Sequence, residues 1–477
     1  MKPEQANHRK KILKDPVAAY TQEYPKGQQQ HINELQKLWT EYQSNNQQRK
    51  TIQQQTQQIS RKIGEAKREG QSIDAFKQEM QELSDKLKSL AEQLKMIEKQ
   101  ILNIFEPQES NETPNHSESE EALQRVYAGS EEGSHNIAIS LLDTEQQAWN
   151  DYVENNPAAS IYHRAEWREL IHKCFGHETC YFLARDTNNA IVGVLPLVRL
   201  KSRLFGDFQV SMPYFNYGGA VADHPLIEQQ LMAEANQYAK QRGISHIEYR
   251  DDIPRKDLPA RTDKVNMVLP LPSSEEELWQ GFTPKLRAQI KRPQREAPEV
   301  LLGGKDLLDD FYAVFARNMR DLGTPVYGKS FFLNILSVFT QESHILIIRL
   351  NGRPVGAAFL IAHRDTLEIP WASTLKEINH LSMNMLMYWE VLRFAIKTGC
   401  QYFDFGRSSK GAGTYRFKQQ WGAKPKALFW HYWLSDEGEL PALNPSNPKY
   451  ALMIYIWQRL PLMVTNWLGP KIVKNLP

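Results

Sequence analysis

The chain has 477 residues, which is too long for one compact core and predicts roughly two to four domains. Its net charge is only +2, so any affinity for nucleic acid must come from local patches. The first residues lack an apolar core, and no segment has the roughly 18 uninterrupted apolar residues of a membrane-spanning helix. The three cysteines are too few for a disulfide framework, so we expect a cytoplasmic protein.

Residues 35–105 are predicted to form an antiparallel coiled-coil hairpin. Apolar positions recur at alternating steps of three and four from Leu35 to Ile63, and again from Ile73 to Ile104. We expect the helix to reverse between these series, in the glycine-flanked segment 64–70. The first helix and the turn carry a basic edge, which suits a phosphate backbone. The alternative is a dimerisation coiled coil with a solvated face.

The segment 61–70, the second heptad run and residues 101–104 resemble the N-terminal arm of seryl-tRNA synthetases. In those enzymes the arm grips the long variable arm of tRNA. The resemblance therefore implies tRNA binding, and it does not imply aminoacylation, because the synthetase's catalytic domain does not follow. The side chains that we expect to contact tRNA phosphates are Arg49, Lys50, Arg61, Lys62, Lys67 and Arg68. This N-terminal region is taken as 1–106.

Residues 107–135 are acidic, rich in serine and poor in apolar groups, so they predict a flexible linker. After the linker, the pattern predicts two mixed α/β (α+β) units of similar order. In the first unit we expect strands at 137–142, 179–183, 190–198 and 245–249 and a helix at 227–242. In the second we expect strands at 345–350, 355–362, 366–372 and 401–405 and a helix at 381–398. The repeated order suggests a duplication, with domains at 136–264 and 265–438.

Two segments carry candidate chemistry. His172, Cys174, His177 and Cys180 lie too close together for the usual spacing of zinc ligands, so we expect a helix-to-strand turn there and no metal site. In the segment 402–425 a strand is followed by a glycine-rich loop and by basic and aromatic residues. Carboxylate, guanidinium, amine and backbone N–H groups at the end of a strand can form an anion-binding or acyl-transfer site.

The segments 404–408, 413–418 and 421–422, with 212–220 and 322–327 upstream, resemble the FemAB family, in its exopolysaccharide- and exosortase-associated branch. The resemblance spans 135–434 and implies two tandem GNAT-like domains. Well-known members transfer amino acids from aminoacyl-tRNA to an amine of a peptidoglycan precursor. A Phe-Lys pair at their reaction centre matches Phe417 and Lys418 here. Family members with a coiled coil insert it in the second domain, whereas this chain has it at the N-terminus.

The leading prediction is an acyltransferase that moves an aminoacyl group from aminoacyl-tRNA to an amine of a cell-envelope precursor or a surface polysaccharide. The tRNA is a co-substrate and no cofactor is expected. We expect catalysis by Lys418 and Asp404, and substrate binding by Phe417, Arg407, Tyr415, Tyr217 and Tyr327. One alternative is an enzyme that uses acyl-CoA, although the pyrophosphate loop of such enzymes is only approximated. Another is a non-catalytic protein that binds tRNA or a partner.

The last segment, 439–477, has four cations and no acid from residue 449 onward, among tyrosines, tryptophans and aliphatic residues. Prolines divide it into pieces that are too short to span a bilayer. Cations beside interfacial aromatic residues are typical of an anchor that lies on a membrane surface. A helix packed on the second domain is the alternative, and the sequence leaves both open.

Overall fold

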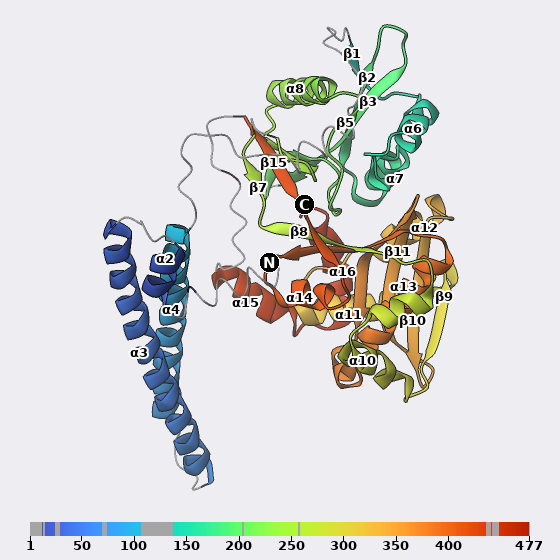
Figure 1. Cartoon of the computed structure of the whole chain (residues 1–477). Coiled ribbons are helices and arrows are strands. Elements are labelled where there is room, and N and C mark those ends of the chain that lie inside the picture. The colour runs from blue at the N-terminus through green and yellow to red at the C-terminus, as the bar shows by residue number, and fades with distance from the viewer. Residues whose placement is uncertain are drawn as a thin grey trace. The chain divides into compact units, whose positions relative to one another are not determined.

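A computed structural model describes residues 12, 15–23, 29–68, 74–105, 137–202, 205–255, 258–435, 440 and 448–476. The chain divides into two compact units, Met1–Ala122 and Leu123–Pro477, each described here by itself (Figure 1). We call the first unit the arm and the second the body. The linker predicted at 107–135 lies outside the described residues.

The arm is a helical hairpin, as predicted. It contains α2 (Pro16–Glu23), α3 (Gln29–Arg68) and α4 (Asp74–Phe105). Helix α3 continues through Gly64 and ends at Arg68, inside the segment 64–70 where the reversal was expected. A glycine inside a helix costs only about 1 kcal/mol relative to alanine, which the packing of a long helix easily outweighs.

Apolar side chains hold the two long helices together along the predicted seam. At the base of the hairpin, Leu35 packs with Ile97 and Ile101, and Tyr20 of α2 meets Phe105 edge to face at 5.5 Å between ring centroids. Beyond them, the Tyr42 hydroxyl donates a hydrogen bond to the Glu98 carboxylate across the seam (3.0 Å). The described seam residues are buried or half-buried because each helix alone would leave its apolar stripe in water.

The body contains two β-sheets. The first has eight strands in the order β1-β2-β3-β4-β6-β15-β7, with β5 also paired to β3. Its strands are β1 (Ala138–Leu141), β2 (Glu178–Arg185), β3 (Ile191–Ser202), β4 (Gly206–Val210), β5 (Val221–Ala222), β6 (His246–Asp251), β7 (Ala260–Arg261) and β15 (Phe429–Leu434). The helices packed on it are α6 (Gln146–Asn155), α7 (Glu166–Phe175) and α8 (Pro225–Gln241). A short turn, η1 (Ile161–His163), lies between α6 and α7.

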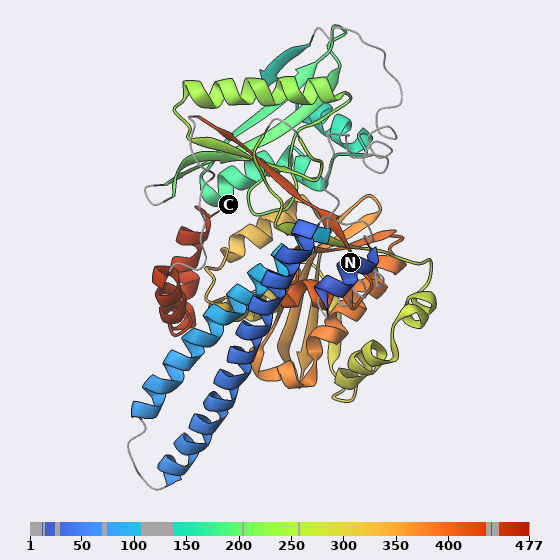
Figure 2. The same cartoon turned by 60° about the vertical axis from the view of Figure 1, so that its left-hand side comes forward.

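Helices cover both faces of this first sheet. Alternate residues of a strand point to opposite faces. On β3, Leu195 and Leu197 belong to the apolar cluster under α8, whereas Val194 and Val198 belong to the cluster that includes α6 and α7. Figure 2 shows α8 lying across the sheet. The continuous apolar run of β3 follows from this burial on two sides.

The second sheet has seven strands in the order β14-β8-β13-β12-β11-β10-β9. These are β8 (Lys264–Pro270), β9 (Glu299–Gly303), β10 (Ser343–Leu350), β11 (Arg353–His363), β12 (Thr366–Thr374), β13 (Tyr402–Ser409) and β14 (Lys424–Ala427). Its helices are α9 (Glu275–Gly281), α10 (Pro284–Gln294), α11 (Leu308–Leu322), α12 (Lys329–Val338), α13 (Met383–Lys397) and α14 (Gly413–Gln419), with short turns η2 (Lys305–Leu307) and η3 (Lys376–Leu381). The hairpin of β10 and β11 turns at Asn351 and Gly352, both with positive φ, as the Asn-Gly pair predicts.

The two sheets share a plan but exchange a strand. Each contains one short parallel pair, β4 with β6 and β12 with β13, among antiparallel neighbours. The chain then returns from the second sheet, and β15 pairs with β6 of the first, where Figure 1 shows it as a red strand among green ones. The range proposed for the second domain, 265–438, thus includes a strand of the first sheet. Hydrogen bonding across the two halves makes the body one folding unit.

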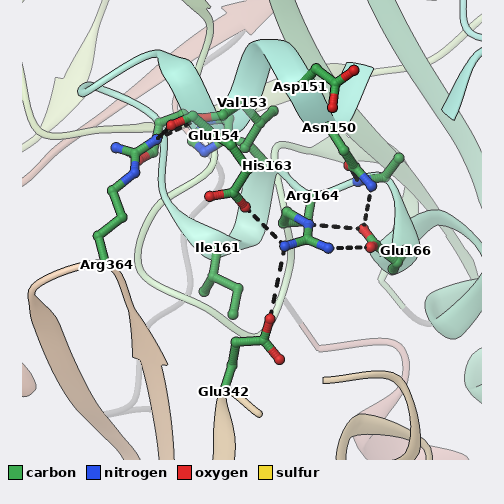
Figure 3. A network of polar contacts seen from close by, with 12 residues as sticks. Asn150, Asp151, Val153, Glu154, Ile161, His163, Arg164, Glu166, Glu342 and Arg364 are labelled. Carbon is green, nitrogen blue, oxygen red and sulfur yellow. Dashed lines mark hydrogen bonds and ion pairs between the residues drawn. The ribbon is translucent and has the colours of Figure 1, made fainter. Parts of the chain in front are cut away.

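Arg364 and Arg164 clamp the two halves of the body together (Figure 3). Arg364, in the turn between β11 and β12, donates to four backbone carbonyls at and after the C-terminus of α6, at 2.5–3.3 Å. A cation here satisfies carbonyls that the helix leaves unpaired and opposes the negative end of its dipole. Arg164 pairs with Glu154 and Glu166 of the first half and lies 3.9 Å from Glu342 of the second.

We expect Arg364→Met to lower the free energy of unfolding by about 2–3 kcal/mol, because several charge-assisted hydrogen bonds are lost and half-buried carbonyls are left unpaired. Urea denaturation measures this change. The matched control is Arg353→Met, since Arg353 pairs with Glu377 on the surface, where an ion pair contributes about 0–1 kcal/mol. Equal losses in the two variants would show that the clamp does not stabilise the body.

The C-terminal segment forms α15 (Pro448–Trp457) and α16 (Leu462–Val473). α16 packs on the second half: Gly469 lies against the backbone of Val326, so closely that a side chain there would collide. Its end contacts the first half, because the Tyr214 hydroxyl and His177 Nε2 both bind the Lys474 carbonyl oxygen at 2.8 Å. Within the described residues, no helix combines the length and apolar character that a bilayer crossing requires.

Candidate active site

The candidate site lies where β12 and β13 part. Their parallel ladder has three residue pairs and ends at Glu368 and Asp404, although both strands continue. Strands that separate leave backbone groups free and open space for side chains from other elements. Both carboxyl groups are buried, with 7% and 4% of their surface exposed. Two adjacent buried carboxyls in a water-poor setting are a marked departure from ordinary strand composition.

Asp404 is held by three donors. Its Oδ1 accepts the Gly406 N–H at 2.7 Å, and its Oδ2 accepts the Tyr217 hydroxyl at 3.2 Å and the side-chain amide of Asn266 on β8. Burial raises the pKa of Asp404, while these donors favour its ionised form and oppose that effect. The arrangement leaves Asp404 a fixed carboxylate that can accept a proton without moving.

Tyr217 reaches Asp404 from a loop of the first half, residues 212–219. The backbone of this loop is strained, because Met212 and Tyr214 both have positive φ, which non-glycine residues rarely adopt. At Gly219 even a methyl group would meet the carboxylate of Asp251 at 1.8 Å, so only glycine fits. Strain of this kind persists where the surrounding structure requires one loop conformation, and here it delivers Tyr217 to the carboxylate.

Glu368 is the second carboxyl of the pair. The Tyr162 hydroxyl of η1 donates to its Oε2 at 2.6 Å. Burial and the neighbouring Asp404 charge raise the pKa of Glu368 to about 8, so it holds a proton at neutral pH. Tyr162 and Tyr217 both come from the first half of the body, and both carboxyls come from the second. The site is therefore built jointly by the two halves.

Lys418 is buried, with 8% of its surface exposed, so it is not the surface lysine that a short helix would allow. Its Nζ donates to the carbonyl oxygens of Gly406 and Arg407, both at 2.9 Å. Gly406 thus connects Asp404 and Lys418, since its N–H binds the Asp404 carboxylate and its carbonyl oxygen binds the Lys418 ammonium. Burial lowers the pKa of Lys418 to about 8. An ammonium has three N–H donors, so one is left for a ligand.

Arg407 is exposed, and its guanidinium lies over the ring of Trp430 on β15 at 4.5 Å. Arg250 lies over the same ring at 4.3 Å. Desolvation of the guanidinium by the surrounding protein and the nearby charge of Arg250 lower the pKa of Arg407 to about 10. No carboxylate in the described part of the chain forms an ion pair with Arg407. A guanidinium that is preoriented by stacking and has its donors free is suited to an anionic ligand.

Aromatic side chains flank the cations. Phe417 packs edge to face on Tyr388 of α13 at 5.1 Å. Tyr415 is half-buried on α14, one turn before Lys418. Tyr327 lies in a separate aromatic cluster with Tyr214, at 5.6 Å, and burial raises its pKa to about 12. The structure thus brings Asp404, Lys418 and Tyr217 together, whereas Phe417 and Tyr327 belong to the aromatic packing beside them.

The corresponding position in the first half carries no free carboxylate. The parallel ladder of β4 and β6 ends at Val210 and Glu248, in the place of Glu368 and Asp404. Glu248 is paired with the buried Arg250 at 2.8 Å and accepts the Tyr432 hydroxyl of β15 at 2.5 Å. The returning strand and the ion pair therefore fill this position. Of the two repeated halves, the second alone offers the open set of charged groups.

Sequence reasoning missed Glu368, Asn266 and Tyr162. The first two had a signal, since each is a strongly polar residue between two apolar neighbours within a strand. Such a residue in a buried strand points to a polar network, because an isolated polar group in the core is costly. Tyr162 carried no signal, because its position depends on the packing of η1 against the other half.

The predicted tRNA contacts lie on the arm. Arg49 is half-buried in α3. The other five predicted residues belong to α3, but their side chains lie outside the described residues; they are Lys50, Arg61, Lys62, Lys67 and Arg68. In the segment with four potential zinc ligands, His172 Nδ1 and the His177 carbonyl are 3.1 Å apart, and Cys180 is buried near Tyr238. Each of these groups takes part in ordinary packing.

Two protein-family models match the chain. The model for the acetyltransferase (GNAT) domain matches residues 284–419, which include Asp404, Arg407 and Lys418. The model for the seryl-tRNA synthetase N-terminal domain matches residues 9–106, which cover the arm. A search of curated protein sequences found no match.

Several solved structures are similar to the body at low sequence identity. A crystal structure of FemX has 13% identity and a TM-score of 0.49, over 66% of this chain and all of the other. The C-terminal domain of a lysylphosphatidylglycerol synthetase from Agrobacterium fabrum has 11% identity and a TM-score of 0.42, over 65% and 94%. A tandem GNAT protein from the clavulanic acid biosynthesis pathway has 10% identity and a TM-score of 0.41, over 64% and 100%.

The family matches confirm the two resemblances found in the sequence, one in the arm and one in the second half of the body. The strand order supports the tandem arrangement, since each half has the same short parallel pair between antiparallel strands. The chain therefore combines a GNAT-type acyltransferase domain with an N-terminal domain of the seryl-tRNA synthetase type.

Proposed function

We propose that the chain transfers an aminoacyl group from an aminoacyl-tRNA to an amine of a cell-envelope precursor or a surface polysaccharide, in the cytoplasm. The observation that carries this proposal is the presence, in one chain, of an arm of the seryl-tRNA synthetase type and a buried Asp404–Lys418 centre within the acetyltransferase domain. If the arm keeps the preference of its relatives, the donor is a seryl-tRNA.

The site supplies what this transfer needs. An aminoacyl ester is already activated, so the enzyme has to orient the amine, accept its proton and stabilise the oxyanion of the tetrahedral intermediate. Asp404 is the acceptor of the proton, because it is buried and fixed by three donors that favour its carboxylate form. Lys418 directs its remaining N–H to the oxyanion. Collapse of the intermediate breaks the ester bond, and the proton held by Asp404 passes to the leaving ribose oxygen, which releases the tRNA 3′-terminal hydroxyl.

Arg407 and the aromatic residues bind the substrates in this proposal. The exposed guanidinium of Arg407 contacts a phosphate of the tRNA 3′ end, and Phe417 and Tyr415 pack against the aminoacyl or terminal base. The arm adds affinity for the rest of the tRNA, and its covalent connection to the body raises the local concentration of the donor. No cofactor is required, because the ester itself supplies the driving force.

An acyl-CoA is the alternative donor, because the matched domain family is named for acetyl transfer. Arg407 would then bind a phosphate of the CoA. Incubation with aminoacyl-tRNA and with radiolabelled acyl-CoA, each with an amine acceptor, separates the two proposals. We expect loss of the aminoacyl label from tRNA that depends on both enzyme and acceptor, and no consumption of acyl-CoA. Consumption of acyl-CoA alone would refute the tRNA proposal, and consumption of neither would favour a binding protein.

The arm's basic edge gives a separate prediction. We expect Lys67→Gln/Arg68→Gln to weaken tRNA binding by about tenfold or more at low salt, and to reduce the slope of log K against log salt by roughly 1–2, because two phosphate contacts are lost. Filter binding at several salt concentrations measures both. The control Lys86→Gln/Lys95→Gln removes the same charge from α4, where charges are balanced. If full-length protein has no tRNA affinity at low salt, the arm is a dimerisation coiled coil.

A further inference from the structure

The C-terminal helices expose more large apolar side chains than any other part of the described body. Met453, Ile454, Tyr455 and Ile456 of α15 are 41–63% exposed, and on α16 Met463 is 81% and Trp467 63% exposed. We call these side chains without Ile454, which also packs on the body, the apolar face. Figures 1 and 2 both show α15 and α16 next to each other. Monomeric soluble proteins seldom display such a concentration without a partner for it.

Arg459 and Lys471 lie at this face, and its segment of the sequence contains no acid. From residue 449 to the C-terminus the chain has four cations, Lys449, Arg459, Lys471 and Lys474, and no aspartate or glutamate. Arg459 lies over the Tyr455 ring at 3.3 Å, and Lys471 lies over the Trp467 ring at 3.6 Å. Asp321 of α11, an acid next to this segment, is already paired with Arg320. Aromatic rings beside lysine and arginine are the usual pattern at a lipid headgroup boundary.

The apolar face is held firmly on the body. Thr465, Gly469 and Val473 of α16 are buried, and Gly469 is in close contact with Val326. On α15, Ile454 lies against Gly323 at the end of α11. One side of each helix thus packs on protein while Met463 and Trp467 remain exposed. The two interpretations of the tail left open by its sequence are therefore compatible: α16 packs on the second half and also presents a surface.

We propose that the apolar face of α15 and α16 binds the surface of a membrane that contains anionic lipids. The exposed apolar side chains enter the headgroup boundary, and the four cations interact with lipid phosphates. A second copy of this chain fits less well, because a symmetric contact would bring the same cations together without any acid to pair with them. The helices lie on the surface, since they are too short to cross it.

The same loop that supplies Tyr217 connects this face to the site. Tyr214 binds the Lys474 carbonyl at the end of α16, and Tyr217, three residues later, binds Asp404. A lipid-bound α16 would therefore hold the 212–219 loop and the carboxylate near the membrane surface. An acceptor amine carried on a lipid could reach the site without leaving the bilayer. The membrane contact itself does not depend on which donor the enzyme uses.

Flotation with the full-length chain tests this inference. We expect the protein to float with vesicles of phosphatidylcholine and phosphatidylglycerol, to remain at the bottom with phosphatidylcholine alone, and to dissociate as salt rises. Met463→Glu/Trp467→Glu should reduce the floated fraction by at least about tenfold, because it places charges in the headgroup boundary. Both side chains are exposed, so folding should be unaffected, and circular dichroism and thermal melting verify this.

The matched control is Leu302→Glu/Leu333→Glu, which puts the same charges at two apolar positions on β9 and α12 that are 47% and 43% exposed. The control should float like the parent chain. Equal flotation of both variants, or no flotation of the parent chain with anionic vesicles, would overturn the inference. Concentration-dependent self-association that Met463→Glu/Trp467→Glu abolishes, without vesicle binding, would assign the face to a second copy instead.

Discussion

Lys418→Met should fold and bind tRNA like the parent chain but lose at least about a hundredfold in turnover. The methionine side chain is close in size to lysine but uncharged, so the substitution removes the N–H donor that we assign to the oxyanion. Donors of this kind typically contribute about 10²–10³ in rate, or roughly 3–4 kcal/mol. The affinity for tRNA should change little, because the arm supplies most of it.

The expected effect of Lys418→Met on stability is small. The substitution leaves the carbonyls of Gly406 and Arg407 without a partner, which costs about 1–3 kcal/mol. It also removes a buried charge, which offsets part of that cost. The control is Lys424→Met, an exposed lysine on the neighbouring β14. Single-turnover rates and urea midpoints should be measured together. Turnover within a few-fold of the parent chain would refute the role of Lys418 and direct attention to Asp404.

Asp404→Asn is expected to be nearly as severe, with turnover lower by about 10²–10³, while Glu368→Gln changes it by only a few-fold at pH 7. A base that accepts the amine proton contributes about 10²–10⁴ in rate. An asparagine cannot accept this proton, and its amide would also face the donors of Tyr217, Asn266 or Gly406. Glu368 already holds a proton at neutral pH because burial and Asp404 raise its pKa, so a neutral glutamine replaces it closely.

The pH dependence of stability tests the raised pKa of Glu368. The folded chain keeps the Glu368 proton up to a pKa of about 8, whereas the unfolded chain releases it near its ordinary value of 4.5. Folded protein therefore binds more protons in this window, and the contribution of Glu368 to stability falls as pH rises from about 5 to 8. Glu368→Gln should remove this fall in urea midpoints. If Glu368→Gln instead abolishes turnover while Asp404→Asn retains it, the assignment of the proton acceptor is reversed.

Local sequence signals predicted the elements of the body well. The Asn351-Gly352 turn fixed a hairpin, and the helix at 381–398 and the strand at 401–405 match α13 and β13 within a few residues. The first arm helix ends at Arg68, within the predicted segment 64–70, and it passes through Gly64 because the packing of a forty-residue helix outweighs this local break signal. Local propensity is reliable where tertiary packing agrees with it.

Contacts between segments distant in sequence could not be predicted. β15 pairs with β6, about 180 residues earlier, and the Tyr162–Glu368 hydrogen bond spans 206 residues. No local pattern encodes such pairs, because they depend on how the two halves of the body pack. The sequence named Tyr217 as a substrate-binding residue, whereas its hydrogen bond to Asp404 and the strained loop that brings it there are visible only in three dimensions.

The sequence by itself determined the helical arm with its basic edge, the repeated α/β order of the body, and the residues around Asp404 and Lys418, because periodicity, turn residues and a local motif each act within a short segment. The tertiary structure decided which groups are buried and what they bind. It showed Lys418 buried against the carbonyls of the Asp404 strand and Glu368 beside Asp404. Burial and neighbouring charge set the pKa of each group, and both arise only when distant segments come together.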